Sequence, residues 1–236
     1  MRILLLLLTW FVLALPATAS ASPSEAALRE ALAAGAAPAR GEAVAPGPQR
    51  TERIEAELVP MGAWATPGST AVVAIRQKIE PGWHTYWRNQ GDSGGPTTLT
   101  WALPTGLKPG EILWPLPERQ RLQSLMNYGY SGTVFLPVPI EIPADAQPGR
   151  SLPLRVTAHF YVCSDEMCVP EDLDLALALP VRDGAAPLDG RFGQAIQDVV
   201  ADAPRPAGIE ARAALVDGRL TLTAVGGPLT GAAPKW

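Results

Sequence analysis

The stretch SLPLRVTAHFYVCSDEMCVPEDLDLALAL, residues 151–179, decides the fold, because large apolar side chains recur in it at every second position. Side chains alternate across a β-strand, so residues of one parity share one face. The pattern therefore predicts two strands, each with one buried face and one polar face. The buried faces are predicted to hold Leu152, Leu154, Val156, Ala158, Phe160 and Val162 in the first strand and Leu173, Leu175, Leu177 and Leu179 in the second.

Both cysteines of the chain lie where these strands meet, with Ser164–Met167 between them. Parity puts Cys163 and Cys168 on the polar faces, away from the leucine core, unless a bulge at Pro170 shifts the count. A connection this short brings two cysteines within disulfide range. Such a bond constrains the unfolded chain by roughly 2 kcal/mol, against about 5 kcal/mol for a 100-residue loop. An accessible redox pair is therefore favoured over a structural bridge.

Two alternatives stay open for the same cysteines. Soft thiolate and thioether ligands suit Cu(I), and His84, Met126, His159 and Met167 are candidate neighbours of the pair. The C-x4-C spacing is not a strong metal motif, however, so no metal ligand is assigned, and no organic cofactor is implied. The second alternative is a passive immunoglobulin-like scaffold in which the disulfide is structural.

Acidic residues surround the cysteines. Asp165 and Glu166 lie between them, Glu171 and Asp172 follow, and the segment 160–175 contains no Lys or Arg. Because nearby carboxylates disfavour a thiolate, both thiols are predicted to have an ordinary or raised pKa. Fast exchange would then need a docked partner that supplies the geometry.

The rest of the main domain, residues 51–182, repeats the alternating pattern in short runs. Clusters of Gly, Pro, Asn or Asp separate the runs, and the chain holds 25 prolines and 22 glycines. Short strands with frequent turns predict an all-β fold, an immunoglobulin-like β-sandwich. The predicted strands are Arg53–Val59, Ser69–Ile79, Thr97–Ala102, Thr133–Ile142, Ser151–Val162 and Asp172–Leu179.

The region before this domain is of a different kind. Residues 1–21 hold an apolar run, Ile3–Leu15, followed by small residues, which is typical of a secretory signal peptide. Residues 22–50 are predicted to form a short helix and an Ala/Pro/Gly linker. An exported chain meets an oxidising compartment, where an even cysteine count is typical of a disulfide.

The region after the domain, residues 183–236, is predicted to form a linker helix and an incomplete second small β domain. The helix is expected over Gly190–Ala201, and Ile209–Leu215 with Arg219–Val225 form a hairpin. Because two strands alone are marginal in water, the sequence is interpreted as a fragment. The formal net charge is −4 at pH 7 without a basic cluster, so nucleic acid is not an expected partner.

Four motifs in a fixed order carry a family resemblance. They are PGWHTYWR at residues 81–88, WP at 114–115, NYGYSG at 127–132, and Cys163-x4-Cys168 followed by Val-Pro-Glu. In this combination residues 51–181 resemble the N-terminal periplasmic domain of the DsbD thiol:disulfide interchange family, in particular its ScsB-like branch, which is linked to copper tolerance. The resemblance implies an immunoglobulin-like sandwich in the periplasm, with Cys163 and Cys168 as its redox pair.

The resemblance also implies a route for electrons. In the family, this domain receives them from a thioredoxin-like domain, which is fed through a membrane-embedded domain, and passes them to periplasmic thiol and disulfide proteins. The present sequence has no membrane span after residue 22 and no C-x-x-C. Membrane contact is therefore expected only through the missing C-terminal part. Cys168 is expected to be the exchanging cysteine.

The family has a cap loop that carries an aromatic side chain and shields the pair until a partner docks. Asn127, Tyr128, Gly129 and Tyr130 match that region, and their sequence predicts a turn-forming loop with two large rings. His84 and Tyr86 match an aromatic-rich strand near the pair. These six residues are expected to shield or orient the cysteines and not to transfer protons.

Overall fold

The computed structural model describes residues 45–122, 124–204 and 208–226. The predicted signal peptide and the helix predicted to begin at Ser22 lie outside these residues. The elements are β1 (Gln49–Arg50), β2 (Ile54–Pro60), β3 (Thr70–Ile79), β4 (Thr85–Gly91), β5 (Thr98–Ala102), β6 (Lys108–Pro109), β7 (Glu118–Leu122), β8 (Leu125–Tyr130), β9 (Thr133–Glu141), β10 (Ser151–Cys163), β11 (Cys168–Pro180), α2 (Gly193–Asp202), β12 (Glu210–Val216) and β13 (Arg219–Val225).

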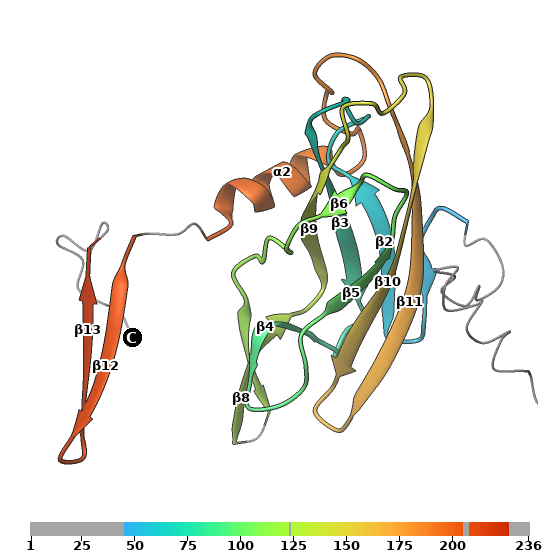
Figure 1. Ribbon diagram of the computed structural model, residues 1–236. Helices are drawn as coiled ribbons and strands as arrows, with labels where there is room; N and C mark the ends of the chain where they lie inside the picture. Colours follow the sequence, from blue (N-terminus) through green and yellow to red (C-terminus); the bar gives the residue numbers. More distant parts are fainter. Residues whose placement is uncertain (1–44, 123, 205–207, 227–236) are drawn as a thin grey trace, which may run out of the picture. The chain divides into compact units, whose positions relative to one another are not determined.

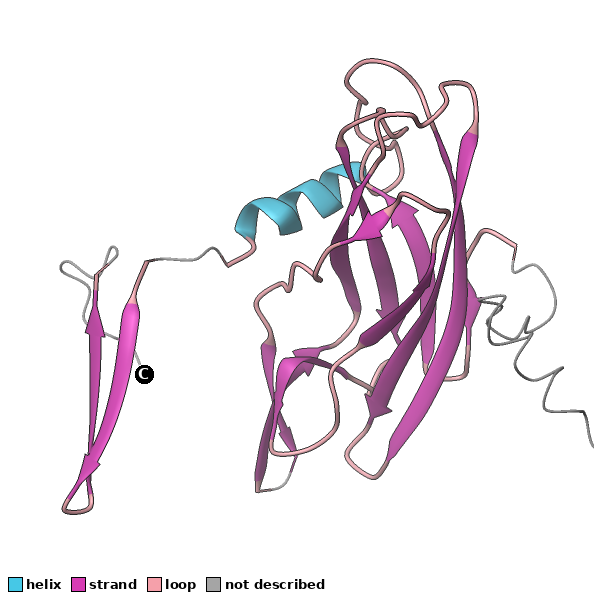
Figure 2. Cartoon of the chain, in the orientation of Figure 1, coloured by secondary structure: helices cyan, strands magenta, loops and turns pink. Residues whose placement is uncertain are grey.

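Two β-sheets face each other and form the sandwich (Figure 1). The larger sheet has the strand order β1-β2-β3-β9-β6, and the smaller one has the order β11-β10-β5. A third sheet, β4-β8-β7, lies beside the ends of β10 and β11 that carry the cysteines. Strands make up most of the described chain (Figure 2). The predicted all-β sandwich is therefore confirmed.

The core lies between the two sheets and is built by the alternation seen in the sequence. Leu154 and Phe160 of β10 are fully buried and belong to one cluster with Ile75 of β3 and Leu136 of β9. Arg155 has the opposite parity and is exposed. Burial of each large apolar side chain contributes about 1.5–3 kcal/mol, so the alternation sets which face of each strand turns inward.

β10 and β11 form one long antiparallel hairpin. Its register is unbroken, from Ser151 opposite Pro180 to Cys163 opposite Cys168. Pro170 pairs with Tyr161, so no bulge shifts the parity there. β11 begins at Cys168, four positions before the predicted start at Asp172.

Five strands are absent from those that the alternating pattern predicts: the two-residue strands β1 and β6, and all three strands of the third sheet, β4, β7 and β8. β8 contains Asn127 and Gly129, residue types that are depleted in strands. β4 has an irregular register between Tyr86 and Gly91, which breaks the alternation that reveals a strand. Pairing with neighbouring strands thus outweighs local preference in this third sheet.

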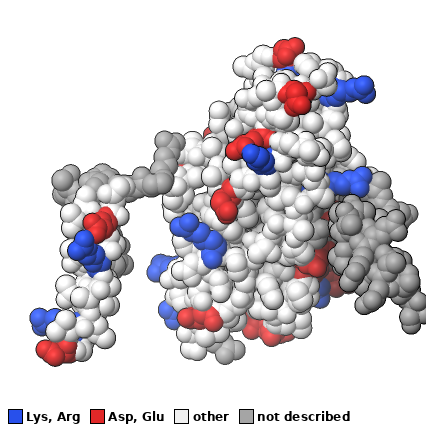
Figure 3. Space-filling model, in the orientation of Figure 1, with Lys and Arg blue, Asp and Glu red and all other residues white. Residues whose placement is uncertain are grey.

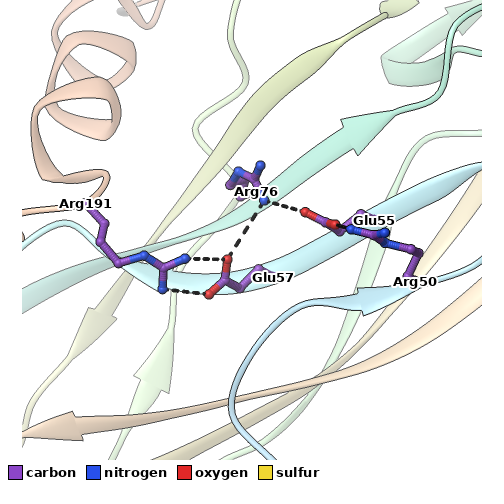
Figure 4. Close-up of polar contacts among 5 residues, drawn as sticks. All are labelled: Arg50, Glu55, Glu57, Arg76 and Arg191. Carbon is purple, nitrogen blue, oxygen red and sulfur yellow. Dashed lines mark hydrogen bonds and ion pairs between the residues drawn. The ribbon is translucent and has the colours of Figure 1, made fainter.

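The outer face of the larger sheet carries an ionic network (Figure 4). Glu55 accepts hydrogen bonds from Arg76, at 2.9 Å, and from Arg50. Glu57 accepts two hydrogen bonds from Arg191, at 3.0 and 3.1 Å. Both carboxylates are buried on this outer face, and charges buried in pairs avoid the large cost of an unpaired buried charge.

The network also fixes the segment that leads into α2. Arg191 lies just before the helix, and Ile196 of the helix packs against Val59 and Ala74 of the larger sheet. A helix thus lies in the predicted range, although it begins at Gly193 and packs on the outer face of the larger sheet; its role as a linker stays a prediction. Within the described ranges, the structure has no helix long and apolar enough to cross a membrane.

β12 and β13 form the predicted hairpin, with Leu215 opposite Leu220 and Ala213 opposite Leu222. Parity puts these four residues on one face, and the three leucines are exposed. Whether this hairpin begins a second domain stays a prediction.

Charged side chains are scattered over the face of the molecule drawn in Figure 3. Acidic and basic groups of the described residues lie interspersed there, with wide uncharged areas between them. Neither sign of charge dominates this face. The charge distribution therefore gives no indication of a surface that attracts a charged partner over a long range.

Glu55 is expected to make stability depend on pH. Hydrogen bonds from Arg76, and next from Arg50, hold the pKa of Glu55 below its ordinary value. A lowered folded-state pKa adds stability above the unfolded-state pKa, about 4.3 for Glu, and this stability is lost as the pH falls through the folded-state pKa. Glu55→Gln is therefore expected to lower the free energy of unfolding at pH 7 by on the order of 1–3 kcal/mol, and by progressively less in acid.

Urea unfolding between about pH 3 and pH 7 measures this difference, since the pH window brackets the carboxyl titration. Glu111→Gln, at an exposed position, is the matched control and should change stability by less than about 0.5 kcal/mol. An equal loss for Glu55→Gln at both ends of the pH range would contradict the prediction.

Candidate functional site: the Cys163–Cys168 pair

The two cysteines form a disulfide at one end of the sandwich. Cys163 ends β10, Cys168 begins β11, and their Cα atoms lie 4.0 Å apart. Because the two residues are directly opposite in the register, both side chains lie on one face of the hairpin, as parity predicted. The N–H of Ser164 donates to the carbonyl of Met167 at 2.8 Å and closes the turn.

The two cysteines differ in exposure. Cys163 is 0% exposed, whereas Cys168 is exposed. The expectation that both are accessible is wrong for Cys163, because β10 also pairs with the start of the third sheet. The N–H of His84 donates to the Cys163 carbonyl at 2.9 Å, and the N–H of Cys163 donates to the His84 carbonyl at 3.0 Å. Cys168 is therefore the more accessible of the two cysteines.

Tyr86 contacts the more exposed cysteine. Its hydroxyl lies 3.6 Å from Cys168 Sγ and 3.2 Å from His84 Nε2, and the two rings meet edge to face with centroids 5.1 Å apart. Tyr86 and His84 are both buried. The structure thus brings these two predicted site residues together with the pair.

Burial sets the protonation of both rings. It raises the pKa of Tyr86, and it lowers the pKa of His84, although the nearby charge of Asp165 acts in the opposite direction on the imidazole. At neutral pH the imidazole is therefore uncharged and the phenol keeps its proton. The Tyr86 hydroxyl can then donate to a sulfur or to the ring nitrogen of His84.

The segment predicted to be a cap loop is a strand. Asn127, Tyr128, Gly129 and Tyr130 belong to β8, which pairs with both β4 and β7. A Cβ on Gly129 would collide with the carbonyl of Thr85, so glycine lets β8 and β4 approach closely. The local conformation predicted for this segment is therefore wrong.

The two tyrosines of β8 lie on the other side of this strand from Tyr86. Tyr86 is opposite Gly129 in the register, so Tyr128 and Tyr130, which have the other parity, point away from it. Tyr130 is buried in the core, and its hydroxyl donates to the Pro115 carbonyl at 2.9 Å. A shielding role for these tyrosines stays a prediction.

A loop that was not predicted to belong to the site lies against it. This loop, Asp92–Gly95, is the first part of the connection from β4 to β5. Asn127, which is 0% exposed, makes two hydrogen bonds to Ser93. The sequence Asp-Ser-Gly-Gly-Pro, residues 92–96, lies in one of the Gly- and Pro-containing clusters that separate the predicted strands. Its signal was the pair of glycines, since adjacent glycines permit a close approach of backbone to a ring.

His159 makes its contacts elsewhere. Its Nδ1 lies 2.8 Å from Asp172 Oδ1 and its Nε2 lies 3.0 Å from Thr100 Oγ1, on the outer face of the smaller sheet. Of the predicted Cu(I) neighbours, His84 contacts the pair through its backbone, and Met167 adjoins Cys168 in the chain. In the part of the chain that the structure describes, no group of three or more His, Cys, Asp and Glu side chains is placed to hold a metal ion.

The fold and the site together define a class of protein. A β-sandwich that carries a disulfide between adjacent strand ends, with one cysteine buried and one exposed, is suited to thiol–disulfide exchange. The family model described as thiol:disulfide interchange protein DsbD, N-terminal, matches residues 55–180. The chain belongs to this family, which confirms the resemblance seen in the four motifs and supports thiol:disulfide interchange in general. No curated protein matches the chain.

Solved structures are similar in fold. The N-terminal periplasmic domain of ScsB from Proteus mirabilis has a TM-score of 0.54 and 18% identity, over 75% of this chain and 66% of that one. The N-terminal domain of DsbD from Neisseria meningitidis in the reduced form has a TM-score of 0.31 and 17% identity, over 55% of this chain and 90% of that one. The first likeness confirms the fold, and this chain spans 66% of the ScsB structure.

Tyr86→Phe is expected to raise the pKa of the Cys168 thiol. In a Cys163→Ala background Cys168 is the single thiol, and the midpoint of its alkylation rate against pH should rise by about one pH unit. The reason is that a hydrogen bond to a charged group contributes about 1.5–3 kcal/mol, and one pKa unit corresponds to about 1.4 kcal/mol.

Iodoacetamide alkylation followed by mass spectrometry over a pH series measures this midpoint. Tyr161→Phe removes a hydroxyl from an exposed ring near the pair and is the matched control, with no expected change. If Tyr86→Phe left the midpoint where it is, the hydroxyl would not act on the thiolate.

Proposed function

We propose that this chain is a periplasmic thiol:disulfide interchange module that passes two electrons to exported partner proteins, as in protein-disulfide reductases. Family membership supports the class of reaction. The observation that carries the proposal is the contrast between buried Cys163 and exposed Cys168 beside the Tyr86 hydroxyl. An exchanging pair needs one sulfur that a partner reaches first and one that resolves the mixed disulfide.

The proposed exchange starts from the reduced pair. The Cys168 thiolate attacks one sulfur of the partner's disulfide, so that a mixed disulfide forms and the partner's other sulfur leaves as a thiolate. Cys163, after losing its proton, attacks Cys168 Sγ and releases the partner's first sulfur as a second thiolate. The two partner thiolates take up protons from solvent, so the partner has gained two electrons and the domain is left with its disulfide.

Side chains around the pair support these steps. A hydroxyl at the position of Tyr86 would donate a hydrogen bond to the Cys168 thiolate and favour its formation. The Nε2 of His84 lies 3.2 Å from that hydroxyl and would help to orient it. Neither residue needs to carry a proton between reactants, in keeping with the role predicted from the sequence.

Reduction of the disulfide would run the same steps in reverse. A thioredoxin-like donor domain is the proposed source of electrons, and its thiolate would attack Cys168 and release Cys163. The proposed location is the periplasm, which the signal peptide predicted for residues 1–21 supports. The ScsB structure similar in fold is itself described as a periplasmic domain.

The reduction potential of the Cys163–Cys168 pair tests this function. In the mature chain, residues 22–236, the potential is expected to lie above about −300 mV, because structural disulfides of secreted proteins lie below that value. Thiol alkylation in a series of redox buffers, read by mass spectrometry, gives the number. A reduction potential well below about −300 mV would mean that the disulfide is structural, and the proposed electron-carrier function would then be wrong.

The same preparation tests the copper alternative. Stoichiometric Cu(I) binding by the reduced chain that is lost in Cys163→Ser would favour a copper-binding module. A competition titration with a chromogenic Cu(I) chelator gives this result independently of the potential.

Single-cysteine variants test the order of the steps. Cys163→Ala retains the exposed thiol and is expected to form a mixed disulfide with a small aromatic disulfide reagent at least about tenfold faster than Cys168→Ala, since reactivity follows exposure and thiolate character. The colour released by the reagent gives both rates. Comparable rates, or a faster Cys168→Ala variant, would show that the exposed cysteine is not the attacking one.

A further inference from the structure

We propose that Asn127 and Ser93 are positioning residues for the exchange reaction, which hold the Tyr86 hydroxyl as a hydrogen-bond donor to the Cys168 sulfur. The proposal rests on the function proposed above and adds to it a device that lies away from the cysteines. It also gives Asn127 a role other than that of a cap residue.

Four hydrogen bonds join the loop Asp92–Gly95 to β8. The N–H of Asp92 donates to the Met126 carbonyl at 3.2 Å, and the N–H of Met126 donates to Asp92 Oδ2 at 2.8 Å. The N–H of Ser93 donates to Asn127 Oδ1 at 3.0 Å, and Asn127 Nδ2 donates to Ser93 Oγ at 2.9 Å. The two residues at the start of the loop are therefore held to β8 through both backbone and side chain.

The two bonds to Ser93 define the orientation of the buried amide. A backbone N–H can only donate, so the end of Asn127 that faces the N–H of Ser93 must be the oxygen. Nδ2 then faces the Ser93 hydroxyl, which accepts from it and keeps its own proton to donate. Ser93 precedes Gly94, whose backbone lies against the ring of Tyr86, and the Ser93 hydroxyl lowers the pKa of Tyr86 against the larger effect of burial.

Packing holds the loop on the tyrosine ring. Gly94 has a φ of +76°, and a Cβ at this residue would overlap the ring of Tyr86. A Cβ at Gly95 would lie 2.8 Å from the ring of Tyr161. The loop backbone therefore rests directly on both rings, and a side chain at either position would push it off.

The contacts lead from Asn127 to the reacting sulfur. Hydrogen bonds hold Ser93 to Asn127, the backbone of the next residue, Gly94, rests on the ring of Tyr86, and the Tyr86 hydroxyl lies 3.6 Å from Cys168 Sγ. The loop thereby fixes the ring, and with it the position of the hydroxyl beside the sulfur. Asn127 would thus act on the Cys168 thiolate without touching it.

The test uses the single-thiol Cys163→Ala background. Asn127→Ala and Ser93→Ala are each expected to move the midpoint of Cys168 alkylation upward, so that the rate at pH 8 falls about three- to tenfold, as for half to one pKa unit. The double variant Asn127→Ala with Tyr86→Phe is expected to show no further change than Tyr86→Phe alone, because groups in one network are not additive.

Gln120→Ala is the matched control. Gln120 lies opposite Asn127 on β7, and its amide contacts Glu118, so its removal should leave the midpoint unchanged. If Asn127→Ala does not fold, Ser93→Ala decides the matter, because Ser93 is only half-buried and lies in a loop. The thermal midpoint of each variant is recorded beside the alkylation profile.

Two results would overturn the proposal. One is a lowered thermal midpoint with an unchanged alkylation midpoint, which would make Asn127 purely structural. The other is a double variant whose shift is the sum of the two single shifts, which would mean that Asn127 acts independently of Tyr86. Neither result depends on the reduction potential, so failure of this proposal and failure of the exchange function are told apart.

Discussion

The pairing of β10 with a strand on each side of Cys163 is the constraint on which the rest of the site depends. β11 places Cys168 directly opposite Cys163, and the start of the third sheet pairs His84 with Cys163 on the other side. Cys163 therefore lies in the middle of three paired segments, while Cys168 lies at the edge. The N–H and carbonyl of Cys163 are paired with those of His84, and this pairing brings a segment over Cys163 that excludes solvent from it. Among the residues that the structure describes, Cys168 has no such neighbour on its outer side, so the two cysteines differ in exposure although they share one face.

This arrangement separates two demands on a thiol–disulfide exchange site. One sulfur has to be reachable, and the other has to stay close enough to resolve a mixed disulfide without competing for partners. The uncharged rings of His84 and Tyr86 surround the pair without placing a positive charge beside it. Together with the acidic turn at Asp165 and Glu166, such surroundings provide no positive charge that would stabilise a thiolate, in keeping with the ordinary or raised thiol pKa predicted from the sequence.

Much of the sandwich could be predicted from the sequence, because its strands have one buried face and so alternate. The long strands of both main sheets, the hairpin near the C-terminus and the helix before it were predicted within four residues of their observed bounds, whereas the two-residue strands β1 and β6 were not predicted. The third sheet was missed, because Asn127 and Gly129 look like turn residues and β4 is irregular. Asn127 and Gly129 lie in a strand because β8 pairs with β4. The backbone of β4 comes so close to position 129 that only glycine fits there, and the local sequence does not reveal this contact.

The sequence by itself determined that two cysteines would meet at the end of a hairpin, on the face away from the leucine core, since the side-chain period of a strand is two. It also determined, through its four motifs, the family to which the chain belongs. Only the tertiary structure decided which cysteine is buried and which side chain reaches the sulfur. The reason is that burial of Cys163 depends on the distant His84, and the contacts of Tyr86 depend on a loop and a strand that are separated from it in the chain. Contacts of this kind form between strands that are distant in the sequence, so they cannot be predicted from the spacing of residues along the chain.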